Sequence, residues 1–572
     1  MKQLMLGNKA LARGLYEAGC SVVSSYPGTP STEVTEEAAK YDEIYCEWAP
    51  NEKVAMEVAF GASLAGKRSF CGMKHVGLNV AADPLFTCSY TGVNGGMVIC
   101  VADDPGMHSS QNEQDSRHHA IASKIPMLEP SDSTEAYEFA KKAFELSEEF
   151  DTPVIIKMCT RVAHSQSIVE PGERVVPETI PYEKNIAKYV MMPGNAIRRH
   201  PVVEERTRKL IEYGNHCDFN RVEMGDTKLG IITSSTCYQY AKEVFGDKAS
   251  ILKIGLVNPL PDQLILDFAA KVEKLAIIEE LDPILENHCK ELGLTVTGKD
   301  ALPMEGEFSQ NLIAEKLGIE VPAHKELGEA LPGRPPVMCA GCPHRGLFFT
   351  LSKNKCTVLG DIGCYTLGAV APLSAMEMTL CMGASISSIH GFNKAMGKEG
   401  EKRSVGVIGD STFIHSGMTG LANIAYNQSN STVIILDNSI TGMTGHQQNP
   451  TTGYNIKGDP AGKIDLESLC RSMGFNRVRV VDLAACDTVI KEELAAEEPS
   501  VIISRRPCAL LKYVKHNPPL KVEKENCVGC KSCMRLGCPA ISVKDKKAVI
   551  DTTLCVGCGV CQQLCKFDAL QA

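Results

Sequence analysis

Eight cysteines stand close together near the end of the 572-residue sequence, in two similar runs. The first run reads CVGCKSCMRLGCPA from Cys527, and the second reads CVGCGVCQQLCKFDAL from Cys555. Each run has three cysteines at C-x2-C-x2-C spacing and a fourth farther along. Three thiolates at this spacing wrap around one face of an iron–sulfur cubane, so the residues could carry single electrons.

The runs match the bacterial two-cluster ferredoxin pattern, in which the fourth cysteine of each run ligates the other cluster. Two features depart from that pattern: four residues separate Cys533 from Cys538, and Lys566 follows the last cysteine where proline is common. Paired structural zinc sites are the alternative. The pattern predicts one [4Fe-4S] cluster on Cys527, Cys530, Cys533 and Cys565, and another on Cys555, Cys558, Cys561 and Cys538.

A second candidate site lies in SVGVIGDSTFIHSGMTGLANIAYNQSNSTVIILDNSITGMTGHQQNP, residues 404–450. The apolar runs VGVI and TVIIL predict two strands joined by a helix, and polar residues follow both strands at one sheet edge. An Asp, an Asn and a carbonyl two residues later supply half of an octahedral Mg²⁺ shell and leave positions for diphosphate oxygens. The expected Mg²⁺ ligands are Asp410, Asn438 and Ile440.

The residues around these ligands fit a diphosphate group. The loop TGMTGHQ offers Thr441, Thr444 and Gly445 for close backbone approach to phosphates. The whole arrangement resembles the thiamine diphosphate motif, in which Gly-Asp-Gly is followed by a later Asn. Here Gly409 opens the motif and Ser411 replaces its last glycine. Two ordinary loop ends are the alternative for the Asp–Asn pair taken alone.

Composition limits the kind of protein that holds these sites. At roughly 100–200 residues per domain the chain suggests three to five domains. A net charge of −10, from 59 basic and 69 acidic residues, gives no sign of a nucleic-acid surface. No apolar run approaches the roughly 18 residues of a membrane span. Because the 25 cysteines are grouped in twos and threes, cluster ligation in a reducing cytoplasm fits better than disulfides.

Five further motifs, GNKALARG, YPGTPSTE, CAGCPHRG, GDIGCYTLG and GDSTFIHSG, precede the ferredoxin-type tail. In this order they resemble the α subunits of indolepyruvate ferredoxin oxidoreductases, within the 2-oxoacid:ferredoxin oxidoreductase family. The resemblance covers nearly the whole chain and implies multidomain α/β, transketolase-like thiamine-diphosphate-binding folds with a C-terminal α+β two-cluster ferredoxin domain. The implied segments are a pyrimidine-binding domain (1–170), a linker (171–225), a transketolase C-terminal-like domain (226–325), a thiamine diphosphate- and Mg-binding domain (326–515) and the ferredoxin-type domain (520–572).

The resemblance also implies catalytic residues. Glu52 stands at the position of the glutamate that hydrogen-bonds the cofactor's aminopyrimidine and so promotes deprotonation of thiazolium C2. Glu57 is the fallback, and a solvated helix glutamate is the plainer alternative. Thr29, in YPGTP, would lie near the substrate's carboxyl or carbonyl group, or simply form a strand-end turn. His108 and Arg117 are expected to offer polar or cationic contacts to a 2-oxoacid.

The resemblance also implies a third [4Fe-4S] cluster beside the cofactor. Pyruvate-oxidising members of the superfamily ligate such a cluster with a C-x2-C pair, one cysteine soon after it and one distant cysteine. The matching residues here are Cys339, Cys342, Cys364 and Cys508, and His344, two residues after the pair, is expected to contact the cofactor. The alternative is that Cys339 and Cys342 are buried free thiols and that Cys364 contacts the diphosphate.

The implied reaction is oxidative decarboxylation of an aryl 2-oxoacid with coenzyme A, with ferredoxin as electron acceptor and a shorter β subunit in an α2β2 heterotetramer. The alternatives are the same chemistry on another 2-oxoacid, a non-oxidative thiamine-dependent decarboxylase and a non-catalytic electron-transfer subunit. Basic residues in the tail could steer an acidic ferredoxin or form an ordinary solvated face. They are Lys521, Lys524, Lys531, Arg535, Lys544, Lys546 and Lys547.

Overall fold

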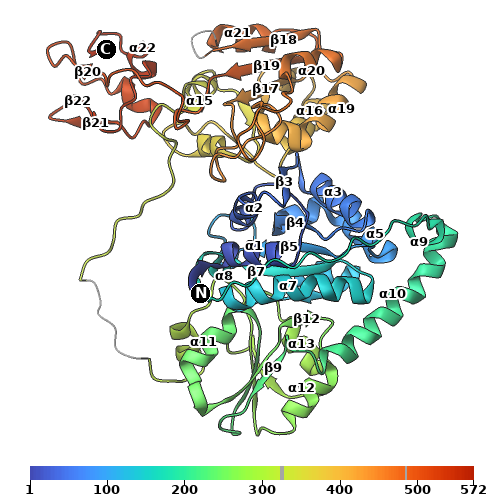
Figure 1. Cartoon of the computed structure of the whole chain (residues 1–572). Coiled ribbons are helices and arrows are strands. Elements are labelled where there is room, and N and C mark those ends of the chain that lie inside the picture. Colours follow the sequence, from blue (N-terminus) through green and yellow to red (C-terminus); the bar gives the residue numbers. More distant parts are fainter. Residues whose placement is uncertain (322–327, 483–485) are drawn as a thin grey trace. The chain divides into compact units, whose positions relative to one another are not determined.

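The structure, a computed structural model, describes residues 1–321, 328–482 and 486–572. The chain forms two compact units, Met1–Glu326 (unit 1) and Leu327–Ala572 (unit 2) (Figure 1). Within the described ranges, no helix is both long enough and apolar enough to span a bilayer.

Unit 1 is built on a seven-stranded sheet in the order β12-β6-β7-β5-β4-β2-β3. Neighbouring strands are parallel except β12, which pairs antiparallel with β6. Central strands such as MVICVAD are buried along their whole length, as expected for a sheet covered on both faces. The strands are β2 (Val22–Ser25), β3 (Tyr45–Trp48), β4 (Ser69–Lys74), β5 (Met97–Asp103), β6 (Met127–Leu128), β7 (Val154–Cys159) and β12 (Leu256–Asn258).

Helices connect these strands, and capping side chains fix where two of them begin. The Asn51 side chain accepts a 2.9 Å hydrogen bond from Val54 N at the start of α3, and Asp132 accepts one from Glu135 N at the start of α7. A short antiparallel pair, β1 (Gln3–Leu6) and β8 (Gln166–Val169), lies outside the sheet. The helices are α1 (Gly7–Glu17), α2 (Thr32–Ala38), α3 (Glu52–Leu64), α4 (His75–Val80), α5 (Ala82–Thr91), α6 (Arg117–Ser123), α7 (Ser133–Phe150) and α8 (Thr160–His164).

A second sheet of unit 1 has the order β14-β13-β10-β11-β9, with β9 antiparallel to β11. Its strands are β9 (Arg221–Glu223), β10 (Gly230–Thr233), β11 (Ser250–Lys253), β13 (Leu275–Ile278) and β14 (Val296–Thr297). Its helices are α11 (Ser235–Phe245), α12 (Asp262–Ala269), α13 (Ile284–Glu291) and α14 (Gln310–Lys316).

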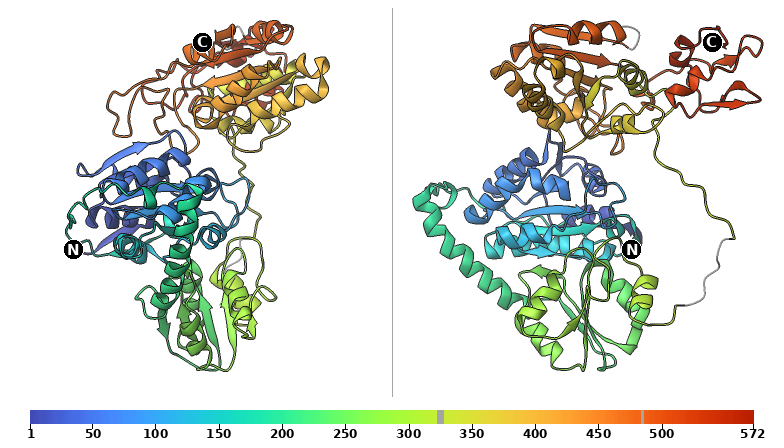
Figure 2. Two further views of the ribbon diagram at one scale, coloured as in Figure 1. Left: turned by 90° about the vertical axis from the view of Figure 1, so that its right-hand side faces the viewer. Right: turned by 180° about the vertical axis from the view of Figure 1, so that it is seen from behind.

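The segment 171–225, expected to be a linker, contains a short helix, α9 (Ile186–Tyr189), and a long one, α10 (Pro193–Gly214) (Figure 2). Helix α10 buries Val203 and Leu210, which lie two helical turns apart on one face. Arg206 is also buried and donates a 2.7 Å hydrogen bond to Ser89 O. The sequence did not predict this helix because most of its residues are polar and it contains Pro201. Only a narrow stripe of its surface is apolar.

Unit 2 contains a five-stranded parallel sheet in the order β15-β16-β17-β19-β18. The predicted strands VGVI and TVIIL are β16 and β17, and every residue of both is buried. Ile434 and Leu436 of β17 join one hydrophobic cluster while Val433 and Ile435 join another, so helices cover both faces. The strands are β15 (Thr357–Leu359), β16 (Ser404–Gly409), β17 (Thr432–Asp437), β18 (Arg477–Val481) and β19 (Ser500–Arg505).

Helical segments connect the strands of unit 2. They are α15 (His344–Lys353), η2 (Cys364–Ala369), α16 (Ala384–Met396), α17 (Lys398–Glu401), α18 (Asp410–Thr412), η3 (Phe413–Gly417), α19 (Met418–Tyr426), α20 (Leu466–Ser472) and α21 (Cys486–Leu494). The predicted helix between β16 and β17 is therefore made of α18, η3 and α19.

The cysteine-rich tail has little regular structure. It contains a hairpin, β21 (Ile541–Lys544) with β22 (Lys547–Ile550), the antiparallel pair β20 (Lys521–Val522) and β23 (Leu570–Gln571), a 3₁₀ turn, η4 (Ser532–Leu536), and one short helix, α22 (Val560–Gln563). Its small core includes Cys527, Cys533 and Cys561 beside a few aliphatic side chains. A module of this size needs bound groups to hold it together.

Candidate functional site

Three oxygens converge at the carboxyl ends of β16 and β17. The side-chain oxygen of Asn438 lies 2.8 Å from the carbonyl oxygen of Ile440 and 3.3 Å from Asp410 Oδ1. All three are acceptors, and Asp410 and Asn438 are buried. In an octahedral Mg²⁺ shell with metal–oxygen distances of about 2.1 Å, adjacent ligand oxygens lie about 3 Å apart. The arrangement of the predicted ligands therefore fits a bound Mg²⁺.

The electrostatics of Asp410 also favour a cation. Burial, with the nearby Asp437 adding to it, raises the pKa of Asp410 to about 7. Its oxygens accept hydrogen bonds from Ser411 N at 2.8 Å and from the Thr451 hydroxyl at 3.3 Å. Rotating the Asn438 amide would let its nitrogen donate to Ile440 O and Asp410 instead. A bound divalent ion would attract all three oxygens, so the Asn438 amide could keep its orientation. The ion would also stabilise the charged form of Asp410.

The predicted diphosphate loop folds back on this corner. The Thr441 hydroxyl donates a 2.9 Å hydrogen bond to Ser411 Oγ, and the Thr444 hydroxyl donates one of 2.5 Å to the Gln447 side chain. Gly445 has a φ of +119°, which favours glycine. The loop thereby places Thr441 directly beside the residue that follows Asp410.

Asp361 is a residue that sequence reasoning missed. It is fully buried, and its carboxylate accepts hydrogen bonds of 2.9 Å from Gly383 N, Ser385 N and Ile362 N. The Thr412 hydroxyl, close to Asp410, donates to Ile362 O at 3.0 Å. Asp361 thus fixes the turn that leads to Cys364. An available signal was GDIG, an aspartate directly after a short apolar run.

His344, the first residue of α15, lies beside the predicted Mg²⁺ ligands. Its Nε2 is 3.5 Å from Asn438 Nδ2, and its ring packs edge-on against Tyr365. Burial lowers the pKa of His344 to about 4, so the imidazole is neutral near pH 7. The structure therefore brings this predicted cofactor-binding residue to the same sheet edge.

The four cysteines proposed for a third cluster meet next to this edge. Cys508 N donates a 2.9 Å hydrogen bond to Asn438 O, and Cys364 Sγ is 3.7 Å from the position that a Cβ on Gly442 would take. Burial raises the pKa of Cys364, and the neighbouring thiols of Cys508 and Cys339 raise it further. Burial also raises the pKa of Cys342 to about 12, with contributions from Cys339 and Cys364. The thiols of Cys339, Cys342, Cys364 and Cys508 thus lie close enough to influence one another electrostatically.

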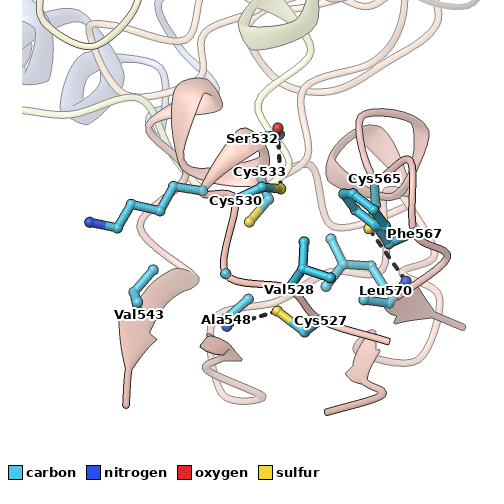
Figure 3. A pocket seen from close by; sticks show the side chains of 13 residues that line it. Cys527, Val528, Cys530, Ser532, Cys533, Val543, Ala548, Cys565, Phe567 and Leu570 are labelled. Carbon is cyan, nitrogen blue, oxygen red and sulfur yellow. Dashed lines mark hydrogen bonds between the residues drawn. The ribbon is translucent and has the colours of Figure 1, made fainter. Parts of the chain in front are cut away.

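The tail cysteines separate into the two predicted sets. Cys527, Cys530, Cys533 and Cys565 line one pocket (Figure 3). Two backbone amides point at its sulfurs, Ala548 N at 3.4 Å from Cys527 Sγ and Ala569 N at 3.3 Å from Cys565 Sγ. Such N–H donors stabilise thiolate charge and tune cluster potentials.

The second set surrounds Cys561. Burial raises the pKa of Cys561 to about 12, and the neighbouring thiols of Cys558, Cys538 and Cys555, followed by Cys533 of the first set, raise it further. The three thiols predicted to share a cluster with Cys561 are thus among its neighbours, and the ligand sets stay a prediction.

The loop that carries Cys339 and Cys342 connects the sheet edge at Asp410 to the cysteine-rich tail. Arg345 Nη1 donates a 2.8 Å hydrogen bond to Leu536 O, and its Nη2 donates to Cys339 O at 3.2 Å. A Cβ on Gly341, between Cys339 and Cys342, would lie 2.2 Å from Val556 Cγ2. The loop that carries the C-x2-C pair thus packs against the tail loops that carry Cys538 and Cys558.

Glu52 and Thr29 lie at the carboxyl edge of the large sheet in unit 1. Glu52 is buried at the start of α3, and its side chain packs against Gly77, where a Cβ would lie 2.5 Å from Glu52 Oε1. Glu57, the fallback, is exposed and forms an ion pair with Lys53. Thr29 is half-buried in the turn after β2. Glu52 differs from Glu57 because it is buried at the carboxyl edge of the sheet, whereas Glu57 is exposed to solvent.

Arg117, predicted to contact a substrate, lies inside unit 1. Its guanidinium is fully buried and donates to Asp115 at 2.6 Å, to Glu279 at 2.6 Å and to the carbonyl oxygens of Glu280 and Asp282. These groups use its donors to join α6 to the segment after β13. Sequence reasoning could not see Glu279, which is 162 residues away.

His108 lies in an exposed loop of unit 1 that follows β5. Its Nε2 is 3.3 Å from Glu307, a carboxylate that also pairs with Arg161 at 2.7 Å. The side chain of His108 is 52% exposed.

Three protein-family models match the chain. The model for "Pyruvate flavodoxin/ferredoxin oxidoreductase, thiamine diP-bdg" matches residues 13–228. The model for "Thiamine pyrophosphate enzyme, C-terminal TPP binding domain" matches residues 361–504 and contains Asp410 and Asn438. The "4Fe-4S binding domain" model matches residues 548–571. The expected fold class, thiamine-diphosphate-binding α/β folds followed by an iron–sulfur domain, is confirmed.

Curated proteins match over nearly the full length. The indolepyruvate oxidoreductase subunit IorA of Archaeoglobus fulgidus is 39% identical, with 100% of this chain and 97% of that protein covered. The subunit of the same name from Thermococcus kodakarensis is 41% identical over 99% of this chain and 96% of its own length. A solved 2-oxoglutarate:ferredoxin oxidoreductase from Magnetococcus marinus aligns with a TM-score of 0.48 at 19% identity, over 55% of this chain and 65% of that one.

Proposed function

Because the chain belongs to the family of indolepyruvate oxidoreductase IorA subunits, we propose that it is the thiamine-dependent α subunit of a 2-oxoacid:ferredoxin oxidoreductase. The proposed substrates are an aryl 2-oxoacid of the indolepyruvate class and coenzyme A. The products are the aryl-acetyl-CoA, CO₂, one proton and two electrons, which leave singly on ferredoxin. One observation carries the proposal: the oxygen corner at Asp410 adjoins a series of thiol groups that leads to the tail.

The chain's own residues have distinct proposed roles at the cofactor. Thiamine diphosphate, when bound, supplies the electron sink for decarboxylation. Asp410, Asn438 and the Ile440 carbonyl would hold its Mg²⁺, while the loop at Thr441 would contact the diphosphate. Glu52 would hold a proton at the aminopyrimidine. The neutral His344 offers a hydrogen-bonding group beside Asn438 without adding a positive charge.

The electron path is proposed to use three [4Fe-4S] clusters. The group of Cys339, Cys342, Cys364 and Cys508 would bind the first, next to Asn438. The set around Cys561 would bind the second, since its loops pack against the C-x2-C loop. The set that contains Cys527 would bind the last. Iron–sulfur clusters suit the one-electron steps that separate a two-electron oxidation from ferredoxin.

The proposed partners follow from this chemistry. Six of the seven basic residues noted in the tail are exposed, and they offer a surface to an acidic ferredoxin. A shorter β subunit would complete an α2β2 enzyme in the cytoplasm. Coenzyme A would accept the acyl group in the final step.

An anaerobic assay tests the proposal. The chain, purified with its β partner, is given a panel of aryl, branched-chain and simple 2-oxoacids with coenzyme A and a viologen dye. We expect dye reduction that depends on coenzyme A and is fastest with an aryl 2-oxoacid. A preference for another 2-oxoacid would support the first alternative, whereas aldehyde formation without dye reduction would indicate a non-oxidative decarboxylase. Purified protein without thiamine diphosphate would indicate a non-catalytic electron-transfer subunit.

A further inference from the structure

We propose that Lys74 binds the carboxylate of the 2-oxoacid substrate. This inference rests on the proposed function and names the cationic residue of its substrate site. The sequence suggested Arg117 for this role, but the donors of Arg117 are used inside unit 1. The substrate carboxylate therefore needs another cation at the edge where Thr29 and Glu52 lie.

Lys74 stands at that edge. It is the last residue of β4, and β4 pairs in parallel with β2, the strand that precedes Thr29. A Cβ on Gly28, next to Thr29, would lie 3.0 Å from Lys74 Cβ. Helix α4 begins directly after Lys74, and its Gly77 packs against Glu52. Lys74 thus stands at the end of the strand next to β2, against the turn that carries Thr29, and the helix that follows it packs against Glu52.

The charge of Lys74 has no counter-ion in the part of the chain that the structure describes. Lys74 is 8% exposed, and its Nζ donates a 2.7 Å hydrogen bond to a neutral group, the carbonyl oxygen of Ser109. Two other buried lysines of unit 1 behave differently: Lys157 Nζ is 2.9 Å from Glu129, and Lys253 Nζ is 2.6 Å from Glu135. Buried charges are normally paired, so Lys74 is suited to an anion supplied by a ligand.

The nearest acidic residue does not provide that anion. Asp104 influences Lys74 electrostatically, yet its oxygens accept hydrogen bonds from Ser109 N at 2.9 Å, the Ser110 hydroxyl at 2.5 Å and the Thr160 hydroxyl at 2.7 Å. Burial lowers the pKa of Lys74, which an anion in contact would reverse. Of the three ammonium protons, one is used by Ser109 O, which leaves donors for a carboxylate.

The loop that bonds Lys74 is exposed to solvent. Ser109, whose carbonyl receives the Lys74 proton, belongs to a loop with exposed residues from Met107 to Ser109. Thr29, which follows the neighbouring strand β2, is half-buried and has a hydroxyl that can donate. A carboxylate there could accept from both an ammonium and a hydroxyl. Such charge-assisted bonds discriminate strongly against a neutral analogue.

The test compares charged and neutral analogues in the enzyme purified with its β partner. An aryl-lactate and its primary amide serve as competitive inhibitors of the wild type and of the Lys74→Met, Lys74→Arg and Lys40→Met variants. Lys40 is an exposed lysine of unit 1 and serves as the matched control. Thiamine diphosphate content is measured for each variant, because cofactor binding should not change.

We expect wild type and Lys40→Met to bind the acid about tenfold or more tightly than the amide. Lys74→Met should bind both equally and show a KM for the 2-oxoacid raised about tenfold, while Lys74→Arg keeps part of the preference. A Lys74→Met variant that still prefers the acid, or that loses thiamine diphosphate, would overturn the assignment. Absence of any 2-oxoacid turnover by the wild type would instead overturn the proposed function and, with it, this role.

Discussion

The side-chain oxygen of Asn438 lies 2.8 Å from the carbonyl oxygen of Ile440, in a buried corner that also contains Asp410. Two acceptors at this distance repel each other unless a cation lies between them or the amide rotates so that its nitrogen faces the carbonyl oxygen. This pair joins the carboxyl end of β17 to the loop that packs against Ser411.

Asp410→Ala should weaken binding of both Mg²⁺ and thiamine diphosphate, because it removes the charged member of the oxygen set. We expect a loss of about tenfold or more in cofactor affinity, measured as bound thiamine diphosphate at several Mg²⁺ concentrations. Glu399→Ala changes an exposed acid of the same unit and is the control. Equal cofactor content in the Asp410 variant and the control would refute the metal assignment.

Glu52→Gln should keep the fold and bind thiamine diphosphate but lose turnover by about a hundredfold or more, because an amide cannot relay the same proton. The control is Glu57→Gln, which alters an exposed residue on the same helix and should retain a near-normal rate. Steady-state dye reduction, normalised to bound cofactor, gives the comparison. If the two variants exchanged these outcomes, the catalytic role would belong to Glu57.

Iron content should report three clusters. Roughly twelve irons per chain are expected for three [4Fe-4S] clusters, and roughly eight for the ferredoxin-type tail alone. Cys508→Ala should lower iron in anaerobically purified protein, whereas Cys381→Ala, at an exposed cysteine outside the three groups, should not. A Cys508 variant with unchanged iron would remove that residue from the ligand set.

Electrostatic steering should govern the encounter with ferredoxin. Replacing Lys524 and Lys544, both exposed in the tail, by glutamate should slow ferredoxin reduction and reduce its dependence on ionic strength. Reduction of a neutral dye should stay constant because its approach is not steered by charge. Wild-type ferredoxin reduction that does not respond to salt would mean that the basic surface is only solvated.

Local patterns predicted the parts of the site that local sequence encodes. Asp410 and Asn438 follow apolar strands, and C-x2-C spacing groups the tail cysteines, so their places could be read from short segments. Arg117 could not be placed this way, since its partner Glu279 comes from a distant strand end. Lys74 gave no local signal because nothing in MKHVGLN reveals that its ammonium is buried without a carboxylate.

The boundaries of the predicted linker also depend on contacts between residues that are far apart in the sequence. The polar stretch that contains Pro201 reads as a linker, yet Val203 and Leu210 pack inside unit 1 and stabilise α10. Strand β12 follows the predicted boundary at residue 225 but pairs with β6 in the first sheet. Only long-range pairing decides such assignments.

The most direct measurement is the stoichiometry of the complete reaction. With the β partner, an aryl 2-oxoacid, coenzyme A and ferredoxin under anaerobic conditions, the account predicts two ferredoxins reduced for each acyl-CoA and each CO₂ formed. The Glu52→Gln enzyme should form none of these products. Release of CO₂ without reduced ferredoxin, or ferredoxin reduction that does not require a 2-oxoacid, would contradict the assignment of this chain as a 2-oxoacid:ferredoxin oxidoreductase subunit.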